Sequence, residues 1–437
     1  TAEKMAMRND VEWFRTTFLE PDAPATLSKD DDPWPYVRGF SEYDGLATVV
    51  AAMATHPQLF TKFFDPYNAP GSHTLVLGLN GSVHGIRDGK RVSDLLHYLM
   101  ATAMGPGSGE WFGRMCDHEK PGVHHEGVAT DMIMIGDFGR DQDDEKALIM
   151  AVVMRRIGLI GDLTVVTNLG DSLMRARLAK GTLNALGAHD VVVARGTDAG
   201  RKDEALHDFE SCPYLAAESE IDLRSSHEII FEHIRHAKDN GHYISIVLNS
   251  ALTDMAALLR DPRWEQLAPD TVKNVVAMGG VVEAEDGEVA IDTSAANNSF
   301  DLGSARHVYE TLIGDARFDF SVVTRHAAGV CQLPKKAFDG STHPIALRLT
   351  SVAKPLLQAL WVRTHRSLAE RLAIRDGLPM TRDPDWFRKV FLNPEAPKWL
   401  GRDDDIWAHV RGFNEYDGLT TVVAATATFP KLFEAFF

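Results

Sequence analysis

Short apolar segments alternate with helical segments along much of this chain, from Asp131 onward. The apolar segments are rich in β-branched residues and are bounded by Gly, Asn or Asp, as buried parallel strands are. They are Asp131–Gly136, Leu163–Thr167, Val191–Ala194, Tyr243–Leu248, Asn274–Met278 and Phe318–Thr324. The helical segments between them are Asp144–Arg156, Ser172–Leu186, His227–Asp239, Thr253–Leu259 and Phe300–Leu312. This alternation predicts an α/β fold with a mostly parallel sheet, helices on both faces, and a ligand site at the carboxyl ends of the strands.

Charge and composition exclude several classes of function. The formal net charge of −17 repels phosphate backbones, so we expect no nucleic-acid partner. The sequence has no apolar run of about 18 residues, so we expect no membrane partner. Only three cysteines occur, and they are far apart, which indicates a reducing compartment and predicts a cytoplasmic protein.

The chain also contains a long internal repeat. Residues 5–64 match residues 378–437 without a gap, at an offset of 378 − 5 = 373, and 36 of the 60 positions are identical. An offset of this size corresponds to a whole domain rather than to a solenoid repeat. We therefore interpret residues 1–105 as the closing part of a preceding unit, 106–130 as a linker and 131–437 as the next unit. This arrangement predicts homo-oligomers or head-to-tail tandem units; the alternative is one duplicated tail that serves as an interface.

The richest strand end is the loop Asp137-Phe-Gly-Arg-Asp-Gln-Asp-Asp144, which holds four carboxylates in eight residues. Carboxylates this close repel one another in a partly desolvated crevice, so a positive charge must offset them. Oxygen ligands favour a hard cation, and we expect Ca²⁺, with Mg²⁺ as the other candidate. Helix capping by Asp143 and Asp144 is the alternative explanation, although it accounts for only two of the four aspartates.

Taken with this loop, five further motifs resemble the inosine–uridine nucleoside hydrolase family, in the family's order. They are Thr167-Asn-Leu-Gly-Asp171, Ser250-Ala-Leu-Thr-Asp254, Met278-Gly-Gly280, Ala295-Ala-Asn297-Asn-Ser-Phe-Asp301 and Tyr416-Asp417. The resemblance implies a nucleoside hydrolase-like sheet. It also implies Ca²⁺-dependent hydrolysis of the N-glycosidic bond of a ribonucleoside or related riboside, which gives free base and ribose.

The resemblance also implies roles for individual residues. The cation ligands would be Asp137, Asp143, Asp144, the backbone carbonyl of Thr253, and Asp417. The residues that bind the nucleoside or other ribose-containing small molecule would be Asp171, Asn249, Met278 and Asn297. Asp171 stands where the family has its ribose-binding Asn.

Three positions depart from the family pattern. The family's catalytic base falls on Gly139, so either Asp137 or Asp141 supplies the carboxylate through a rearranged loop, or the base is missing. Tyr416 occupies the position of the leaving-group histidine, and a phenol can donate a proton to a departing base. Ala295 replaces a glutamate. These changes leave an alternative open, namely a catalytically inactive member of the fold that acts as an assembly or ligand-binding module.

Overall fold

The computed structural model divides the chain into two compact units, residues 1–56 and 57–437. It describes residues 74–77, 89–104, 130–139, 142–156, 158–199, 209, 212–283, 289–329, 331–367, 370 and 382–426, all of which belong to the second unit. The N-terminal copy of the repeat, 5–64, lies outside the described residues, as does most of the predicted linker. No helix in the described part of the chain is long and apolar enough to cross a membrane.

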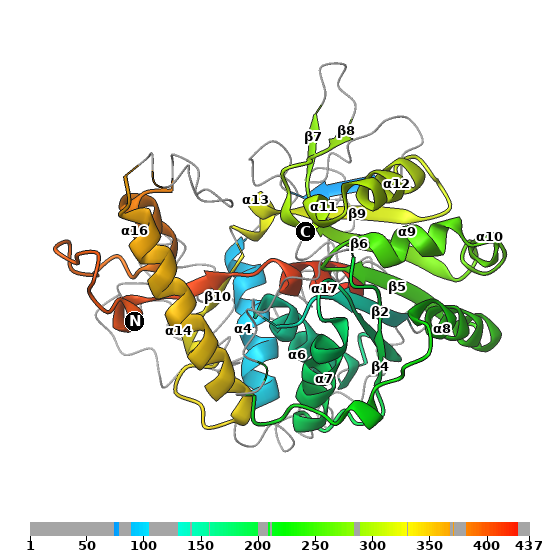
Figure 1. The fold of residues 1–437 in the computed structure, drawn as a ribbon, viewed down its shortest axis with the longest axis horizontal. Coiled ribbons are helices and arrows are strands. Elements are labelled where there is room, and N and C mark those ends of the chain that lie inside the picture. The colour runs from blue at the N-terminus through cyan, green and yellow to red at the C-terminus, as the bar shows by residue number, and fades with distance from the viewer. Residues whose placement is uncertain are drawn as a thin grey trace, which may run out of the picture. The chain divides into compact units, whose positions relative to one another are not determined.

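A seven-stranded sheet forms the centre of this unit (Figure 1), and every neighbouring pair of strands is parallel. The strand order is β1-β9-β6-β5-β2-β3-β4. The strands are β1 (Thr74–Leu77), β2 (Thr130–Gly136), β3 (Leu163–Thr167), β4 (Val192–Arg195), β5 (Tyr243–Leu248), β6 (Val272–Gly279) and β9 (Asp319–Thr324). The predicted α/β class with a parallel sheet is confirmed, and all six predicted strands are present.

Helices cover both faces of the sheet. One face carries α8 (Ser226–Asn240), α9 (Thr253–Arg260), α10 (Pro262–Leu267) and α12 (Leu302–Leu312). Against these helices pack alternate residues of the strands, such as Ile133 and Ile135 of β2 and Ile244, Ile246 and Leu248 of β5. This alternation follows from the two-residue period of a strand.

The opposite face carries α6 (Asp143–Arg156), α7 (Ser172–Ala185) and α17 (Asp417–Thr426). Ser245 Oγ and Asn274 Nδ2, on neighbouring strands of this face, both donate hydrogen bonds to the carbonyl of Ala424 in α17, at 3.2 and 3.3 Å. The odd-numbered positions of β5 and the even-numbered positions of β6 therefore point toward α17. Asn249 and Met278 continue these two series at the carboxyl ends of the strands.

Smaller elements complete the unit. Two antiparallel pairs form, β7 (Val281–Glu283) with β8 (Val289–Ile291), and β10 (Gln332–Pro334) with β11 (Gly412–Asn414). The remaining helices among the described residues are α11 (Ala296–Phe300), α13 (Arg325–Ala328), α14 (Pro344–Thr364) and α16 (Pro384–Phe391). Short 3₁₀ turns are η4 (Glu218–Glu220), η5 (Lys335–Ala337) and η6 (Trp407–His409). The pair β10–β11 leads the chain into α17, whose first residue is Asp417.

The segment before the predicted linker contributes to the same sheet. Strand β1 pairs in parallel with β9 at the sheet edge, with Thr74 opposite Phe320 and Leu77 opposite Val323. Helix α4 (Gly89–Met104) packs against α6 and β10 and buries Val92, Leu96 and Leu99. The assignment of residues 1–105 to a preceding unit stays a prediction. Within the described residues, β1 forms one edge of the sheet whose strand β2 leads into the acidic loop, and α4 packs against α6, which begins in that loop.

Candidate cation and ribose site

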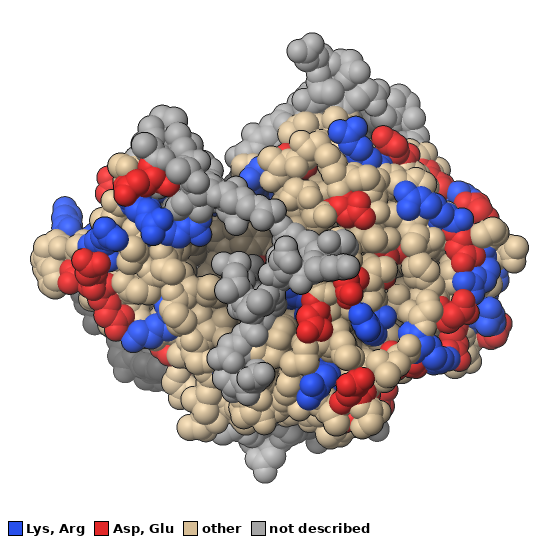
Figure 2. All heavy atoms as spheres, in the orientation of Figure 1, with Lys and Arg blue, Asp and Glu red and all other residues tan. Residues whose placement is uncertain are grey.

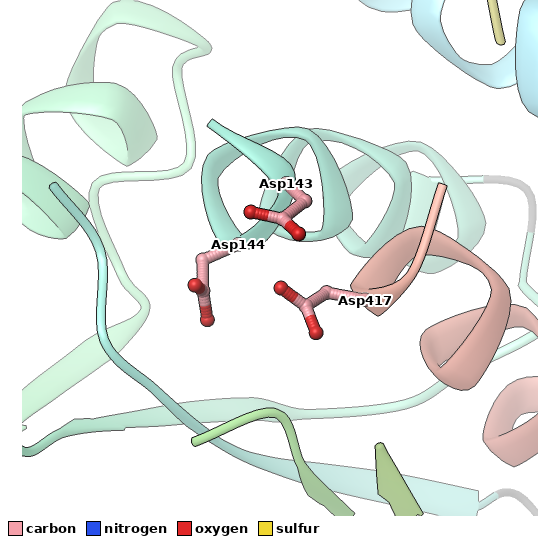
Figure 3. Close-up of side chains that lie close together, drawn as sticks. All are labelled: Asp143, Asp144 and Asp417. Atoms are coloured by element: carbon pink, nitrogen blue, oxygen red, sulfur yellow. The ribbon is translucent and has the colours of Figure 1, made fainter. Parts of the chain in front are cut away.

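Three aspartates from two distant parts of the sequence converge at the carboxyl end of the sheet (Figure 3). Each of Asp143, Asp144 and Asp417 offers a carboxylate oxygen, and these oxygens all lie within 4.8 Å of one another. Asp143 and Asp144 begin α6, and Asp417 begins α17. The side chains of Asp144 and Asp417 are each 3% exposed. The fold therefore places three negative groups around one buried point.

The turn between β2 and α6 explains the position of Asp144. Gly136 ends β2, and a Cβ atom at this residue would collide with Asp144 Oδ1. Only glycine, which lacks that atom, lets the carboxylate approach the strand so closely. The backbone N–H of Asp137 then donates a hydrogen bond to Asp144 Oδ1 at 3.1 Å. Capping of α6, the alternative considered from the sequence, leaves the approach of Asp417 from another helix unexplained.

The electrostatics of the cluster are unfavourable for three bare carboxylates. Burial, followed by the charges of Asp137 and Asp143, raises the pKa of Asp144 well above its ordinary value. Burial, followed by the charges of Asp144 and Asp143, does the same to the pKa of Asp417. The pKa of Asp143 is also raised, chiefly by burial. A hard cation with oxygen ligands would offset this repulsion, so the donor set fits Ca²⁺ or Mg²⁺.

A buried ion pair joins the two segments that carry the cluster. Lys146 Nζ in α6 contacts Glu415 Oε1, two residues before Asp417, and the side chains are 2% and 0% exposed. Burial raises the pKa of Glu415 to about 7 even though the charge of Lys146 opposes that shift. Removing one partner of such a pair leaves an uncompensated buried charge. Lys146 and Glu415 therefore fix how α17 sits against α6.

Two buried arginines hold the backbone of the acidic loop. Arg175 of α7 donates from Nη1 to the carbonyls of Asp137 and Phe138, the latter at 3.1 Å, and from Nε to Leu169 O at 2.6 Å. Arg348 of α14 donates from Nη2 to Gly139 O at 3.3 Å, and its Nη1 contacts the Glu145 carboxylate. Two helices that both follow the loop in the sequence, α7 and α14, thus hold its backbone.

None of these supporting charges was identified from the sequence. A usable signal was the pair Glu145-Lys146, which directly precedes the apolar run 147–154 of α6; the structure buries both side chains. Arg175 and Arg348 had no such signal, because isolated arginines on helices are common on protein surfaces. Their burial depends on contacts between helices that are far apart in the sequence.

The structure brings together three of the four predicted substrate-binding residues. Asn297 Nδ2 donates to the carbonyls of Asn249 and Met278, both at 3.0 Å, and so links the ends of β5 and β6. Asn249 is 2% exposed, and its amide oxygen and nitrogen have no hydrogen-bond partner among the described residues. A buried amide without partners is costly, which points to a polar ligand at this position. Gly136 lies in register beside Asn249, so that amide points to the face on which Asp144 lies.

The other predicted residues that the structure describes lie at the ends of strands or helices. Asp171 caps α7, accepts a hydrogen bond from Met174 N at 3.1 Å and is exposed. Thr253 begins α9, and its hydroxyl donates to Asp301 Oδ2 at 2.9 Å. Asp137 follows β2, with its carboxylate 3.9 Å from Arg175 Nη1. Half-buried Tyr416 directly precedes Asp417, and Asp141 lies outside the described residues.

Comparisons with known proteins support the architecture. No protein-family model matches the chain, and no curated protein matches it. Among solved structures, the type III effector protein XopQ complexed with adenosine diphosphate ribose is 26% identical, with a TM-score of 0.55; the match covers 74% of this chain and 88% of that one. The effector protein XOO4466 is 27% identical, with a TM-score of 0.55, over 69% of this chain and 82% of that one.

Two nucleoside hydrolases also appear among the matched structures. The plant nucleoside hydrolase PpNRh1 is 16% identical with a TM-score of 0.41, and it is matched over 68% of this chain and 79% of its own. An inosine–guanosine nucleoside hydrolase is 13% identical with the same TM-score and coverage. The relation of this chain to the inosine–uridine nucleoside hydrolases stays a prediction.

Proposed function

We propose that this protein is a divalent-cation-dependent N-glycosidase that hydrolyses the bond between ribose and a base or other leaving group. The observation that carries this proposal is the convergence of Asp143, Asp144 and Asp417 within 4.8 Å at the carboxyl end of a parallel sheet. Ligands of such sheets bind at that end of the strands. The unpartnered buried amide of Asn249 lies on the same face and supplies a second polar group for a sugar.

The cation ligands in this proposal are Asp143, Asp144 and Asp417, with Asp137 and the Thr253 carbonyl as the further ligands that the family resemblance implies. When bound, Ca²⁺ or Mg²⁺ would lower the pKa of a water molecule and orient the ribose hydroxyls. The structural requirement on the chain is that α6 and α17 hold their first residues in place. The buried Lys146–Glu415 pair meets that requirement.

The remaining roles follow from position. Asp137, with 22% of its side chain exposed beside the cluster, is the described carboxylate that can accept a proton from an attacking water. Asp141 is the alternative base. Tyr416 would donate a proton to the departing group, and Asn249, Met278 and Asn297 would hold the sugar. Negative charge around the anomeric carbon stabilises the oxocarbenium-like character that develops when the N-glycosidic bond breaks.

The test is an assay for free ribose with a panel of nucleosides in Ca²⁺ and in EDTA. We expect release of ribose that requires the cation and is lost in Asp144→Asn. Asp162→Asn is a matched control, because Asp162 is an exposed aspartate near the opposite end of the sheet. Intact nucleosides under all conditions would contradict catalysis.

A second candidate is a ligand-binding module with the same fold and no hydrolysis. Gly139 at the family's base position and Tyr416 at its acid position favour this function. XopQ, a structural neighbour, was solved with adenosine diphosphate ribose. If adenosine diphosphate ribose binds in calorimetry and is recovered unchanged, while Ca²⁺ still raises the melting temperature, the binding module is the better description.

A further inference from the structure

A polar cavity opens beside the candidate ribose site, at the carboxyl ends of β6 and β9. Its volume is about 400 Å³. The residues that line it are Gly279, Gly280, Val281, Val282, Asp292, Ser294, Thr324, Arg325 and His326. None of them belongs to the acidic cluster or to the residues predicted to bind the sugar. The cavity begins directly after Met278, whose carbonyl accepts the hydrogen bond from Asn297.

Arg325 gives this cavity a fixed positive group. Its Nη2 donates to Asp292 Oδ2 at 3.0 Å and to Ser294 Oγ at 3.1 Å. Asp292 is itself held by Ser294, which donates from its backbone N at 2.8 Å and from its hydroxyl at 2.6 Å. Arg325 therefore makes both of these hydrogen bonds through a single nitrogen, Nη2. Its side chain is 41% exposed, so the other N–H groups of the guanidinium can bind a ligand.

The cavity differs in charge from the acidic cluster, because its one lining carboxylate, Asp292, is paired with Arg325. Burial and the charges of Arg325 and Arg382 lower the pKa of His326, so two guanidinium groups act on this imidazole. Asp292 is the only carboxylate among the lining residues. On the face that Figure 2 shows, acidic and basic side chains of the described residues are interspersed, and the whole chain carries a net charge of −17. A local excess of guanidinium groups favours an anion.

The cavity and the cluster are a suitable distance apart for one ligand. In the sheet, β6 lies two strands from β2 and β9 lies three. With neighbouring strands about 4.8 Å apart, the cavity is roughly 10–14 Å from the end of β2. Asn249 and Met278 lie between the two. A ribose ring bound at the cluster could therefore direct its 5′ substituent into the cavity.

We infer that this cavity is a phosphate subsite, which binds a phosphate or diphosphate ester at the 5′ position of the ribose. The inference rests on the proposed function for the position of the ribose. It makes the preferred ligands phosphorylated ribosides rather than plain nucleosides. Arg325 would bind the phosphate oxygens with charge-assisted hydrogen bonds, while Asp292 and Ser294 hold the guanidinium in place.

Calorimetry on the full chain tests this subsite. Ribose and ribose 5-phosphate are titrated in the presence of Ca²⁺, and inorganic pyrophosphate is titrated in EDTA, where the cation cannot bind the probe. We expect ribose 5-phosphate to bind at least about tenfold more tightly than ribose, because a hydrogen bond to a charged group contributes about that much. Arg325→Gln should remove this preference and weaken pyrophosphate binding, and Arg325→Lys should restore part of both.

Arg317→Gln is the matched control, because Arg317 is 45% exposed and paired with Asp315 and Glu265 away from the cavity. It should leave all three affinities unchanged. If ribose fails to bind but pyrophosphate binds through Arg325, the subsite stands and the proposed function fails. If Arg325→Gln binds ribose 5-phosphate and pyrophosphate as the unaltered chain does, or if neither probe binds the unaltered chain, the subsite is wrong.

Discussion

Buried carboxylates lie near both ends of β2, but the surrounding groups shift their pKa values in opposite directions. At the start of the strand, Asp131 is fully buried, accepts a hydrogen bond from Asp162 N at 2.8 Å and lies 3.3 Å from His242 Nδ1. Burial alone would raise the pKa of Asp131, but His233, Asp162 and His242 together lower it below its ordinary value. At the other end, the pKa values of Asp144 and Asp417 are raised well above theirs.

This difference separates a structural carboxylate from a functional one. The neighbours of Asp131 stabilise its charge, so it needs nothing further. Asp143, Asp144 and Asp417 destabilise one another, and such an arrangement is favourable only when a ligand supplies positive charge. Burial and charge are similar at the two ends, and only the partners differ.

The largest expected effect comes from comparing Asp417→Asn with Asp131→Asn. Asp417→Asn should weaken Ca²⁺ binding by at least about 100-fold, since even second-shell changes cost 10–100-fold, and should abolish hydrolysis. Without the cation it should raise the free energy of unfolding by about 1–2 kcal/mol, because a repelling charge is removed. Asp131→Asn should instead lower the free energy of unfolding by about 1–3 kcal/mol and leave Ca²⁺ affinity unchanged.

Calorimetry with Ca²⁺ and denaturant unfolding in EDTA measure these two quantities for each variant. Unchanged Ca²⁺ affinity in Asp417→Asn would remove this residue from the ligand set. Equal destabilisation by both substitutions would show that the two ends of β2 do not differ.

A smaller effect is expected from Tyr416→Phe. If the phenol donates a proton to the leaving group, kcat for natural nucleosides should fall by about 100-fold, within the usual range for general acid catalysis. A nitrophenyl riboside, whose leaving group departs without protonation, should lose far less. Equal losses on both substrates would show that Tyr416 only packs or positions.

The carboxyls at the two ends of β2 should contribute to the pH dependence of the free energy of unfolding with opposite signs. The carboxyls of the cluster have raised pKa values in the folded chain, so the folded state holds protons that the unfolded state releases above about pH 4. In EDTA, stability should therefore fall as the pH rises from 5 to 8, and Glu415, with its pKa of about 7, extends this loss to neutral pH. Asp131 has a lowered pKa, so its contribution is present at neutral pH and is lost only in acid.

Added Ca²⁺ should reverse the first trend, because deprotonated carboxylates bind it. We expect the Ca²⁺-induced rise in melting temperature to be several degrees at pH 8 and smaller at pH 5. If the rise in melting temperature is the same at both pH values, these aspartates are not the residues that bind the cation.

The smallest effect concerns the repeat. Asp44 corresponds to Asp417 in the N-terminal copy. Since Asp417 lies beside Asp144 in this chain, Asp44→Asn should leave Ca²⁺ affinity unchanged. Comparing it with Asp417→Asn in the same titration is a direct check. A similar loss in both variants would mean that the two copies share the site.

The sequence was sufficient to predict the sheet because buried parallel strands have a strong local pattern. The segment Tyr243–Leu248 was predicted with the bounds that the structure shows. The acidic loop was visible for a similar reason, since four aspartates in eight residues is a local feature. The meeting of this loop with Asp417 came from the family resemblance, because no local pattern relates residues so far apart in the chain.

The supporting interactions could not be predicted in this way. Arg348 reaches Gly139 O only because α14 packs near the loop, and the partner of Lys146 is fixed only once β10 and β11 pair. The position of β1 was also not evident, because its residues lie before the predicted linker. Without β1 the sheet has two edges, β9 and β4, and no local pattern in the sequence tells that β1 pairs with β9.

The positions of β1 and α4 in the fold differ from their positions in the sequence, and this suggests another order in which the same elements could be joined. Both elements follow the first copy of the repeat in the sequence, yet they pack beside β9, α6 and β10, and α17 belongs to the second copy. The end of the second copy, Phe437, corresponds to Phe64 of the first. A circular permutant that carries residues 65–104 after residue 437, and omits 1–64, would therefore keep every described strand and helix and return β1 to the edge of the same sheet.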